Sequence, residues 1–299
     1  MTEQIDAGLQ AYQQAVLAMR QSPALDFPAH VHLETLASCN AACSFCPYPT
    51  IDRQGTKMSD ALIQKIVGDL ADIPRVHAFQ LSPFKVNEPF LDVRLFDLID
   101  LFQERLPQAS ITLTTNASPI TAKVLARLGS LPKIGYLWIS FNDHRQQQYE
   151  EAMKLPYRRT IERLDMIHRA KANQQLPIRV VLSRVSDGTP IDRDFGLWVK
   201  THYPLFEVSL FARGEWLGQT GAQAVHRPPA VGCIRWFDVS ITATGVVAHC
   251  CMDGKAEFPI GDARHSHVLD IYNQPQFRQL RAAALTRQEA DPCRRCSFL

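Results

Sequence analysis

The sequence predicts an α/β protein in which a barrel of parallel strands and helices is followed by a small cysteine-rich segment. Six short stretches rich in β-branched and aromatic residues alternate with helical stretches, at intervals of roughly 30–45 residues, which is typical of parallel α/β barrels. Polar residues end several of these stretches, and the carboxyl ends of barrel strands carry the chemistry in such folds. Five of the eight cysteines follow residue 230.

Composition and charge exclude several classes of partner. The 299 residues are 46% hydrophobic and 21% charged, as expected for a globular enzyme. A net charge of +2 argues against nucleic acid as a partner. The sequence has neither an apolar run of about 18 residues nor a secretory signal, so we expect no membrane partner. Closely spaced cysteines without such a signal indicate a cytoplasmic, metal-binding protein.

The elements follow from apolar spacing and turn residues. An amphipathic helix, expected to pack on the barrel, carries Ile5, Leu9, Tyr12, Val16 and Met19 on one face. Strands are expected at 30–36, 77–83, 109–116, 134–142, 178–184 and 206–211, with a helix at 59–70. A hairpin at 241–250 turns near Gly245, and helical stretches follow at 269–272 and 277–285. The predicted division is an N-terminal helix (1–28), the barrel (29–217) and a small β-hairpin plus helix domain (218–299).

Three cysteines lie together directly after the first predicted strand. Cys39, Cys43 and Cys46 have C-x3-C-x2-C spacing. Three thiolates cannot complete a tetrahedral zinc site, which takes four protein ligands. They can hold three irons of a [4Fe–4S] cluster and leave the fourth iron open. Disulfides suit an odd trio of such short spacing poorly.

The stretch Cys39-Asn-Ala-Ala-Cys43-Ser-Phe-Cys46-Pro-Tyr resembles the signature of the radical S-adenosylmethionine (SAM) superfamily. The resemblance implies a partial (β/α)6, TIM-like barrel with this loop after its first strand. It also implies that the open iron binds the amino and carboxylate groups of SAM. One electron then cleaves SAM to methionine and a 5′-deoxyadenosyl radical, which removes a hydrogen atom from a substrate.

The same resemblance implies which residues bind SAM. Asn87-Glu88-Pro89 stands where the family has Gly-Gly-Glu-Pro; Asn87 departs from that pattern, whereas Glu88 can still accept a hydrogen bond from an ammonium group. Strand-end polar residues complete the expected set, although each serine alone also fits a simple strand-end cap. The set is Phe45, Asn87, Glu88, Thr115, Asn116, Ser140, Asn142 and Ser183.

A second group of cysteines lies in the C-terminal segment. Cys233, Cys250, Cys293 and Cys296 fit either zinc or a second cluster by spacing alone. The segment resembles the short auxiliary-cluster (Twitch) form of the SPASM domain. The longer form has further cysteines, and because the sequence ends at Leu299 the resemblance implies one auxiliary [4Fe–4S] cluster. Cys251 is expected to be structural, since neighbours on a strand point to opposite faces.

The leading hypothesis is a radical SAM oxidoreductase acting on a small polar substrate. The plan resembles 2-deoxy-scyllo-inosamine dehydrogenase and the sulfatase-maturating enzymes, which implies a two-electron dehydrogenation with the auxiliary cluster as electron acceptor. A flavodoxin or ferredoxin would supply electrons. Asp143, His144 and Glu215 are candidate bases, although each alone also fits a surface or helix-start residue.

Three alternatives remain open. An epimerase would use Cys251 as hydrogen donor. A peptide-modifying enzyme, of the kind that matures ribosomal peptides, is disfavoured by the short N-terminal helix. A zinc-stabilised binding protein would have no radical chemistry.

Overall fold

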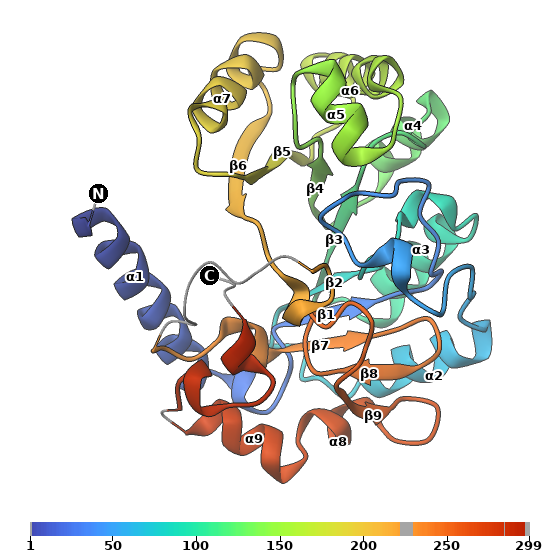
Figure 1. Cartoon of the computed structure of the whole chain (residues 1–299). Coiled ribbons are helices and arrows are strands. Elements are labelled where there is room, and N and C mark those ends of the chain that lie inside the picture. The colour runs from blue at the N-terminus through green and yellow to red at the C-terminus, as the bar shows by residue number, and fades with distance from the viewer. Residues whose placement is uncertain (1, 222–229, 284, 297–299) are drawn as a thin grey trace.

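The computed structural model describes residues 2–221, 230–283 and 285–296, and the side chains of residues 2–7 are not included. The predicted role of Ile5 therefore lies outside the described side chains. A curved sheet forms the centre of the molecule, with strand order β6-β5-β4-β3-β2-β1-β7-β8-β9 (Figure 1). Within the described residues, we find no helix with the length and apolar content needed to cross a membrane.

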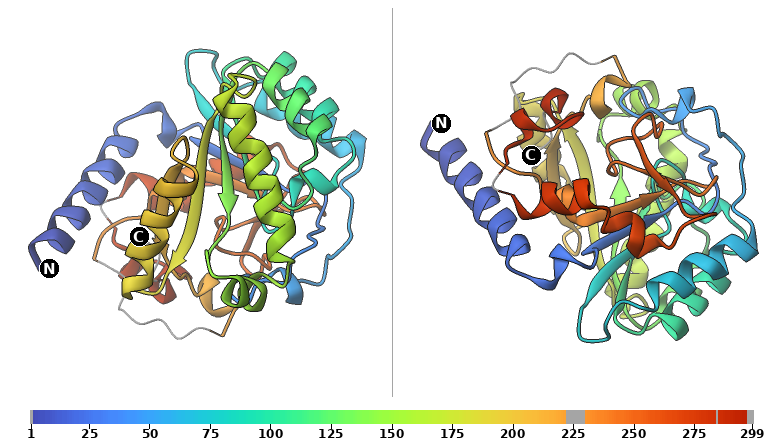
Figure 2. Two further views of the ribbon diagram at one scale, coloured as in Figure 1. Left: turned by 90° about the horizontal axis from the view of Figure 1, so that it is seen from above. Right: turned by 90° about the horizontal axis from the view of Figure 1, so that it is seen from below.

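Six parallel strands build the barrel part, in the order in which they follow one another along the chain. They are β1 (His30–Leu33), β2 (Phe79–Ser82), β3 (Ala109–Thr115), β4 (Ile134–Ser140), β5 (Arg179–Ser186) and β6 (Glu207–Ala212). The connecting helices are α2 (Asp60–Leu70), α3 (Leu95–Arg105), α4 (Ala122–Ser130), α5 (Gln146–Met153), α6 (Tyr157–Ala172) and α7 (Pro190–His202). These helices lie on the outer side of the curved sheet (Figure 2). The predicted open α/β barrel is confirmed.

The two faces of the sheet follow from strand alternation. Val31 and Leu33 of β1 are fully buried in one apolar core with Ile63 and Ile66 of α2. Each such side chain stabilises the fold by roughly 1.5–3 kcal/mol relative to exposure. The intervening residues of β1 therefore face the inside of the barrel. Ser59 caps α2, because its hydroxyl accepts a hydrogen bond from the Leu62 amide.

The C-terminal segment continues the same sheet instead of forming a separate unit. β7 (Asp238–Ile241) pairs parallel with β1, and β8 (Val246–Ala248) and β9 (Pro259–Asp262) follow antiparallel. The predicted hairpin turn is confirmed, with Gly245 at a φ of 88°, where only glycine is free of strain. Two helices complete the segment, α8 (Val268–Tyr272) and α9 (Pro275–Ala282).

The N-terminal helix α1 (Thr2–Arg20) does not pack where the sequence analysis placed it. Its Val16 is buried with Cys233, Trp236 and Phe237 of the C-terminal segment, and Tyr12 packs against the same group. Arg20 donates hydrogen bonds to the carbonyl oxygens of two residues near the end of the chain. Both views of Figure 2 show α1 on the same side of the molecule as this segment. The apolar stripe was read correctly, but its partner lies more than 200 residues away.

Candidate functional site

The cysteine loop, residues 38–47, directly follows β1 at its carboxyl end. The sulfurs of Cys39 and Cys46 accept hydrogen bonds from backbone amides two residues further on, at 3.4 and 3.5 Å. The Cys43 sulfur lies 3.6 Å from the Met153 sulfur. Burial raises the pKa of Cys39 to about 12 and that of Cys46 to about 11. A cationic metal core would offset this cost of ionisation, because metals bind the thiolate form.

Sulfur spacing separates a cluster from a single metal ion. Zinc with bonds of about 2.3 Å holds four tetrahedral sulfurs roughly 3.8 Å apart. Among the side chains that the structure describes, neither cysteine set brings three sulfurs within 4.8 Å of one another. Among the described side chains, neither cysteine set is thus closed into a cage of the size that a zinc ion requires.

Three neighbouring elements hold the cysteine loop. The Ala42 and Ser44 amides donate to carbonyl oxygens at the end of α5, at 3.3 and 2.9 Å. From the segment after β6, Arg213 donates to the Ser44 carbonyl and Trp216 donates to the Phe45 carbonyl. The Glu88 amide donates to the Ser38 carbonyl at 2.8 Å. The loop is thus fixed from both sides of the barrel mouth.

Glu88, Thr115 and Asn116 form one buried hydrogen-bonded group. The Glu88 carboxylate accepts from the Thr115 hydroxyl at 2.8 Å, the Asn116 amide at 2.7 Å and the Phe90 amide at 3.2 Å. The Asn116 side chain donates to Asn40 of the cysteine loop at 2.9 Å. Burial nevertheless raises the pKa of Glu88 from 4.5 to about 7. An acidic group held this way beside the loop suits a cationic ligand.

The side chain of Asn87 stabilises the turn that precedes Glu88. Its side-chain oxygen accepts from the Lys85 amide at 2.9 Å and its side-chain nitrogen donates to the Pro83 carbonyl at 3.3 Å. Asn87 is not among the positive-φ residues of the described chain, so this turn does not require glycine. The side-chain bridge is a physical reason for the departure from Gly-Gly-Glu-Pro.

A hollow of about 350 Å³ opens beside the cysteine loop. Phe45 and Asn142 line it, together with Ser44, Arg184 and Ser186. Ser140, the last residue of β4, pairs with Ser183 inside β5. The Ser183 hydroxyl donates a hydrogen bond to the Ile139 carbonyl at 3.2 Å. The predicted SAM residues therefore fall into a Glu88 group and a hollow-lining group, with Ser183 bonded to the backbone.

The four C-terminal cysteines are also brought together. All four are buried; Cys233 and Cys293 belong to one apolar cluster, and Cys250 and Cys296 to a second. Cys293 and Cys296 flank the turn η7 (Cys293–Arg295), where the Cys296 amide donates to the Cys293 carbonyl. Burial raises the pKa of Cys250, and the neighbouring cysteines raise it further. This set fits a fully cysteine-ligated metal core.

Two family models match the chain over these two sites. The radical SAM superfamily model matches residues 33–187, and an iron-sulfur cluster-binding domain model, SPASM, matches residues 233–297. The chain belongs to the radical SAM superfamily. Membership implies SAM and a [4Fe–4S] cluster, and the SPASM match implies additional iron-sulfur binding. The recognition made from the cysteine motif is confirmed.

Solved radical SAM structures share the fold at low sequence identity. One is BtrN in complex with AdoMet and 2-DOIA, with a TM-score of 0.65, 19% identity, and coverage of 91% of this chain and 94% of that chain. Another is SuiB from Streptococcus suis bound to precursor peptide SuiA, with a TM-score of 0.68, 15% identity, and coverage of 97% and 74%. A third is anSMEcpe with bound AdoMet, with a TM-score of 0.59, 12% identity, and coverage of 90% and 87%. No curated protein sequence matches the chain.

A polar group on the inner barrel wall was missed by the sequence analysis. Strand pairing sets His30 beside Asp238, and His32 beside Ser82. The His32 Nε2 lies 3.4 Å from the Asp238 carboxylate, and the His30 Nε2 lies 2.7 Å from the Ser82 hydroxyl. The available signal was the His-Val-His alternation, which places both imidazoles on one face of β1.

We name His30, His32 and Asp238 the inner polar group. Its spacing resembles that of a metal site. Its three potential ligand atoms lie within 4.8 Å of one another. Arg235, however, already donates to the Asp238 carboxylate at 3.2 Å, so a cation occupies that position. Burial lowers the pKa of both histidines, which keeps them neutral near pH 7. The arrangement fits hydrogen bonding to a hydroxyl group, and Arg235 disfavours a metal ion at Asp238.

The predicted catalytic candidates lie in different surroundings. Asp143 accepts hydrogen bonds from Arg145 and Arg184 at 2.8–2.9 Å, and these partners lower its pKa, which makes it a weak base. His144 packs against the rings of Phe195 and Trp198 on α7. These two residues are tied to structural partners.

Glu215 and Cys251 are placed differently. Glu215 is buried just before the turn η4 (Trp216–Gly218). Cys251 is partly buried, and its thiol lies within electrostatic range of Arg235, Asp238 and Lys85. Cys251 thus neighbours the inner polar group instead of a purely apolar core.

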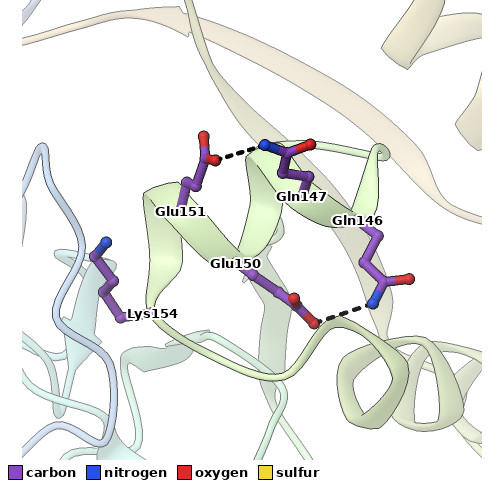
Figure 3. Close-up of a pocket in the computed structure, with 5 residues that line it drawn as sticks. All are labelled: Gln146, Gln147, Glu150, Glu151 and Lys154. Atoms are coloured by element: carbon purple, nitrogen blue, oxygen red, sulfur yellow. Dashed lines mark hydrogen bonds between the residues drawn. The ribbon is translucent and has the colours of Figure 1, made fainter.

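A second hollow lies on the outer surface of α5 (Figure 3). Its five lining residues are Gln146, Gln147, Glu150, Glu151 and Lys154. The glutamines donate to the glutamates one turn later, at 3.4 and 2.9 Å. These pairs are ordinary i,i+4 contacts on a solvated helix face, so we assign no chemistry to this hollow.

Proposed function

We propose that the chain is a radical SAM oxidoreductase that removes a hydrogen atom from a small polar substrate and completes a two-electron dehydrogenation. The convergence of four buried cysteines in the C-terminal segment carries this proposal. A cluster with four cysteine ligands has no open iron, so its natural role is electron transfer. We assign Cys39, Cys43 and Cys46 to the first cluster and Cys233, Cys250, Cys293 and Cys296 to one auxiliary [4Fe–4S] cluster.

When bound, the first cluster and SAM supply a radical that removes a hydrogen atom, and the auxiliary cluster supplies an acceptor for the second electron. The residues of the chain orient the partners. Glu88, with Thr115 and Asn116 behind it, would accept a hydrogen bond from the ammonium group of SAM. Phe45 and Asn142 line the hollow beside the loop, where the rest of SAM has room. A flavodoxin or ferredoxin in the cytoplasm would supply the initiating electron.

Oxidation of a carbinol also releases a proton, which passes to solvent, and the inner polar group can hydrogen-bond the carbinol hydroxyl. His32 is neutral, and its Nε2 faces the Asp238 carboxylate. Burial, Arg235 and Lys85 all lower the pKa of His32, so this imidazole is suited to hydrogen-bond a substrate hydroxyl and not to take up a proton. The polar character of this wall supports a substrate with hydroxyl or amino groups. The solved BtrN complex contains 2-DOIA and the solved SuiB complex contains a precursor peptide, so this fold accepts both small and peptide ligands.

Epimerisation is the second candidate, favoured by the position of Cys251. A thiol that lies beside the inner polar group, outside the proposed ligand set, can return a hydrogen atom to a substrate radical. In that case the substrate is neither oxidised nor reduced overall, and one electron from the flavodoxin or ferredoxin and one proton from solvent would restore the Cys251 thiol from its thiyl radical.

The test begins with anaerobically reconstituted protein beside a Cys39/Cys43/Cys46→Ala triple variant. We expect about eight irons in the wild type and about four in the variant. Small alcohols and amines are then screened in D2O with SAM and a reductant, and products are read by mass spectrometry. Loss of two hydrogens supports dehydrogenation.

A product that differs from the substrate only by one deuterium taken from the solvent supports epimerisation. Cys251→Ser should then abolish epimerisation, while 5′-deoxyadenosine still forms. About four irons in the wild type and none in the triple variant would contradict the auxiliary cluster. The dehydrogenation proposal would fall with it.

A further inference from the structure

Three side chains point hydrogen-bonding groups at two of the C-terminal cysteine sulfurs. The Tyr12 hydroxyl lies 3.6 Å from the Cys233 sulfur. The Trp236 indole N–H donates to the Cys293 sulfur at 3.3 Å, and the His249 Nε2 lies 3.3 Å from the same sulfur.

The geometry fixes the direction of the tyrosine hydrogen bond. The Ile234 amide donates to the Tyr12 oxygen at 3.1 Å. Since that oxygen already accepts from the backbone, its single proton is free to point at the Cys233 sulfur. Trp236 can only donate, because an indole nitrogen has no acceptor lone pair.

These contacts lie in a dry region built by the docked helix α1. Cys233, Cys293 and Trp236 are 5–6% exposed. Val16 of α1 is buried against them. The Arg287 guanidinium lies 5.5 Å from the centre of the Tyr12 ring. Charge-assisted hydrogen bonds are strong in such low-dielectric surroundings.

Hydrogen bonds to ligand sulfurs and exclusion of solvent set the reduction potential of an iron-sulfur cluster. The reduced cluster is more negative than the oxidised one, so a donor stabilises the reduced form more. The sulfurs of Cys39 and Cys46 accept from backbone amides of their own loop. The Asn116 side chain also hydrogen-bonds Cys39. The C-terminal site receives its side-chain groups on two sulfurs, and one of these groups comes from the far end of the chain.

We propose that Tyr12, Trp236 and His249 raise the reduction potential of the auxiliary cluster, which makes it an electron acceptor. This inference rests on the proposed function, because it requires a cluster on Cys233 and Cys293. The three residues act through the ligand sulfurs, as positioning residues. The N-terminal helix thereby becomes part of the redox site, although it contributes no ligand.

The test is a potentiometric titration, monitored by electron paramagnetic resonance, of fully reconstituted Tyr12→Phe and Trp236→Phe proteins. We expect the midpoint potential of the auxiliary cluster to fall in both variants. At a fixed solution potential, the ratio of reduced to oxidised cluster should fall at least tenfold. For one electron, a tenfold change corresponds to about 59 mV. The potential of the first cluster should not change.

Tyr272→Phe is the matched control. It removes a buried tyrosine hydroxyl whose hydrogen bond, at 2.6 Å, goes to the Ala24 carbonyl and not to a sulfur. Both potentials should remain at the wild-type values.

Two outcomes overturn the inference, and iron content distinguishes them. About eight irons per chain with unchanged auxiliary potentials in both variants would overturn it alone and leave the proposed function standing. About four irons in the wild type would mean that no auxiliary cluster exists, and both proposals would fall together. If Tyr12→Phe fails to retain its clusters, the Trp236→Phe titration still decides.

Discussion

Two effects act on the pKa of Glu88 in opposite directions. Burial raises it, three hydrogen-bond donors lower it, and the effect of burial is larger. The pKa of its carboxyl rises from 4.5 to about 7 even though Thr115, Asn116 and Phe90 favour the ionised form. The folded protein therefore binds the Glu88 proton more tightly than the unfolded chain does. The associated stability is fully present below pH 4.5 and is lost as the pH rises through about 7. A cation placed at Glu88, such as the ammonium group of SAM, would offset the free-energy cost of burying the ionised carboxylate.

Glu88→Gln should remove this pH dependence from the cluster-free protein. The free energy of unfolding of the wild type, relative to the variant, should fall by about 2 kcal/mol between pH 5 and pH 8. Urea unfolding at the two pH values measures it. A difference that stays constant, or that grows in favour of the wild type, would contradict the assigned burial of the charge.

At the residue scale, local motifs were predictable and long-range partners were not. The sequence analysis found the cysteine motif and Glu88 because a ligand loop is a contiguous pattern. His32 and Asp238 lie 206 residues apart and meet only through the pairing of β1 with β7. The role of Tyr12 likewise depends on a helix docking that no local pattern encodes.

At the scale of elements, a buried ion pair joins β1, the cysteine loop region and the C-terminal hairpin. The Glu34 carboxylate accepts from Arg53 at 2.5 and 3.0 Å and from the Ala243 amide at 3.0 Å. Arg53 also donates to the Gly254 carbonyl at 2.8 Å. Both ionic side chains are almost fully buried. The pair therefore fixes the hairpin against the end of β1.

Arg53→Ala should destabilise the cluster-free protein by about 3–5 kcal/mol, because it leaves the Glu34 charge buried and unpaired. Urea unfolding by circular dichroism measures the loss. The control is Arg179→Ala, which breaks an exposed pair with Glu207 between β5 and β6 and should cost far less, because water screens an exposed ion pair. Equal losses in the two variants would show that the buried pair has no special weight.

Element positions were predicted well where the pattern was strong. The third strand was expected at 109–116 and is observed at Ala109–Thr115. β9 was not predicted, since Pro259-Ile-Gly-Asp lacks apolar alternation and is defined by its pairing with β8. The continuity of the hairpin with the barrel was also missed, because sheet pairing across distant segments leaves no local trace.

At the scale of the whole molecule, the barrel and the C-terminal segment share one sheet. β7 is paired on both sides, with β1 and with β8. We therefore expect the two parts to unfold as one cooperative unit, although the family matches divide the chain into two models.

Hydrogen exchange tests this expectation. The amides of β7 should exchange as slowly as those of β1, near the limit set by global unfolding. β6, at the edge of the sheet, should exchange faster. Exchange in β7 that is much faster than in β1 would mean that the C-terminal segment opens independently.

The pairing of β1 with β7 also affects how the molecule is made on the ribosome. With synthesis at roughly 5–20 residues per second, β7 emerges roughly 10–40 s after β1. During that interval α1 has no docking surface, because its partners Cys233, Trp236 and Phe237 do not yet exist. The cysteine loop after β1 therefore leaves the ribosome long before the four C-terminal cysteines do. The four C-terminal cysteines come together only after nearly the whole chain has been made.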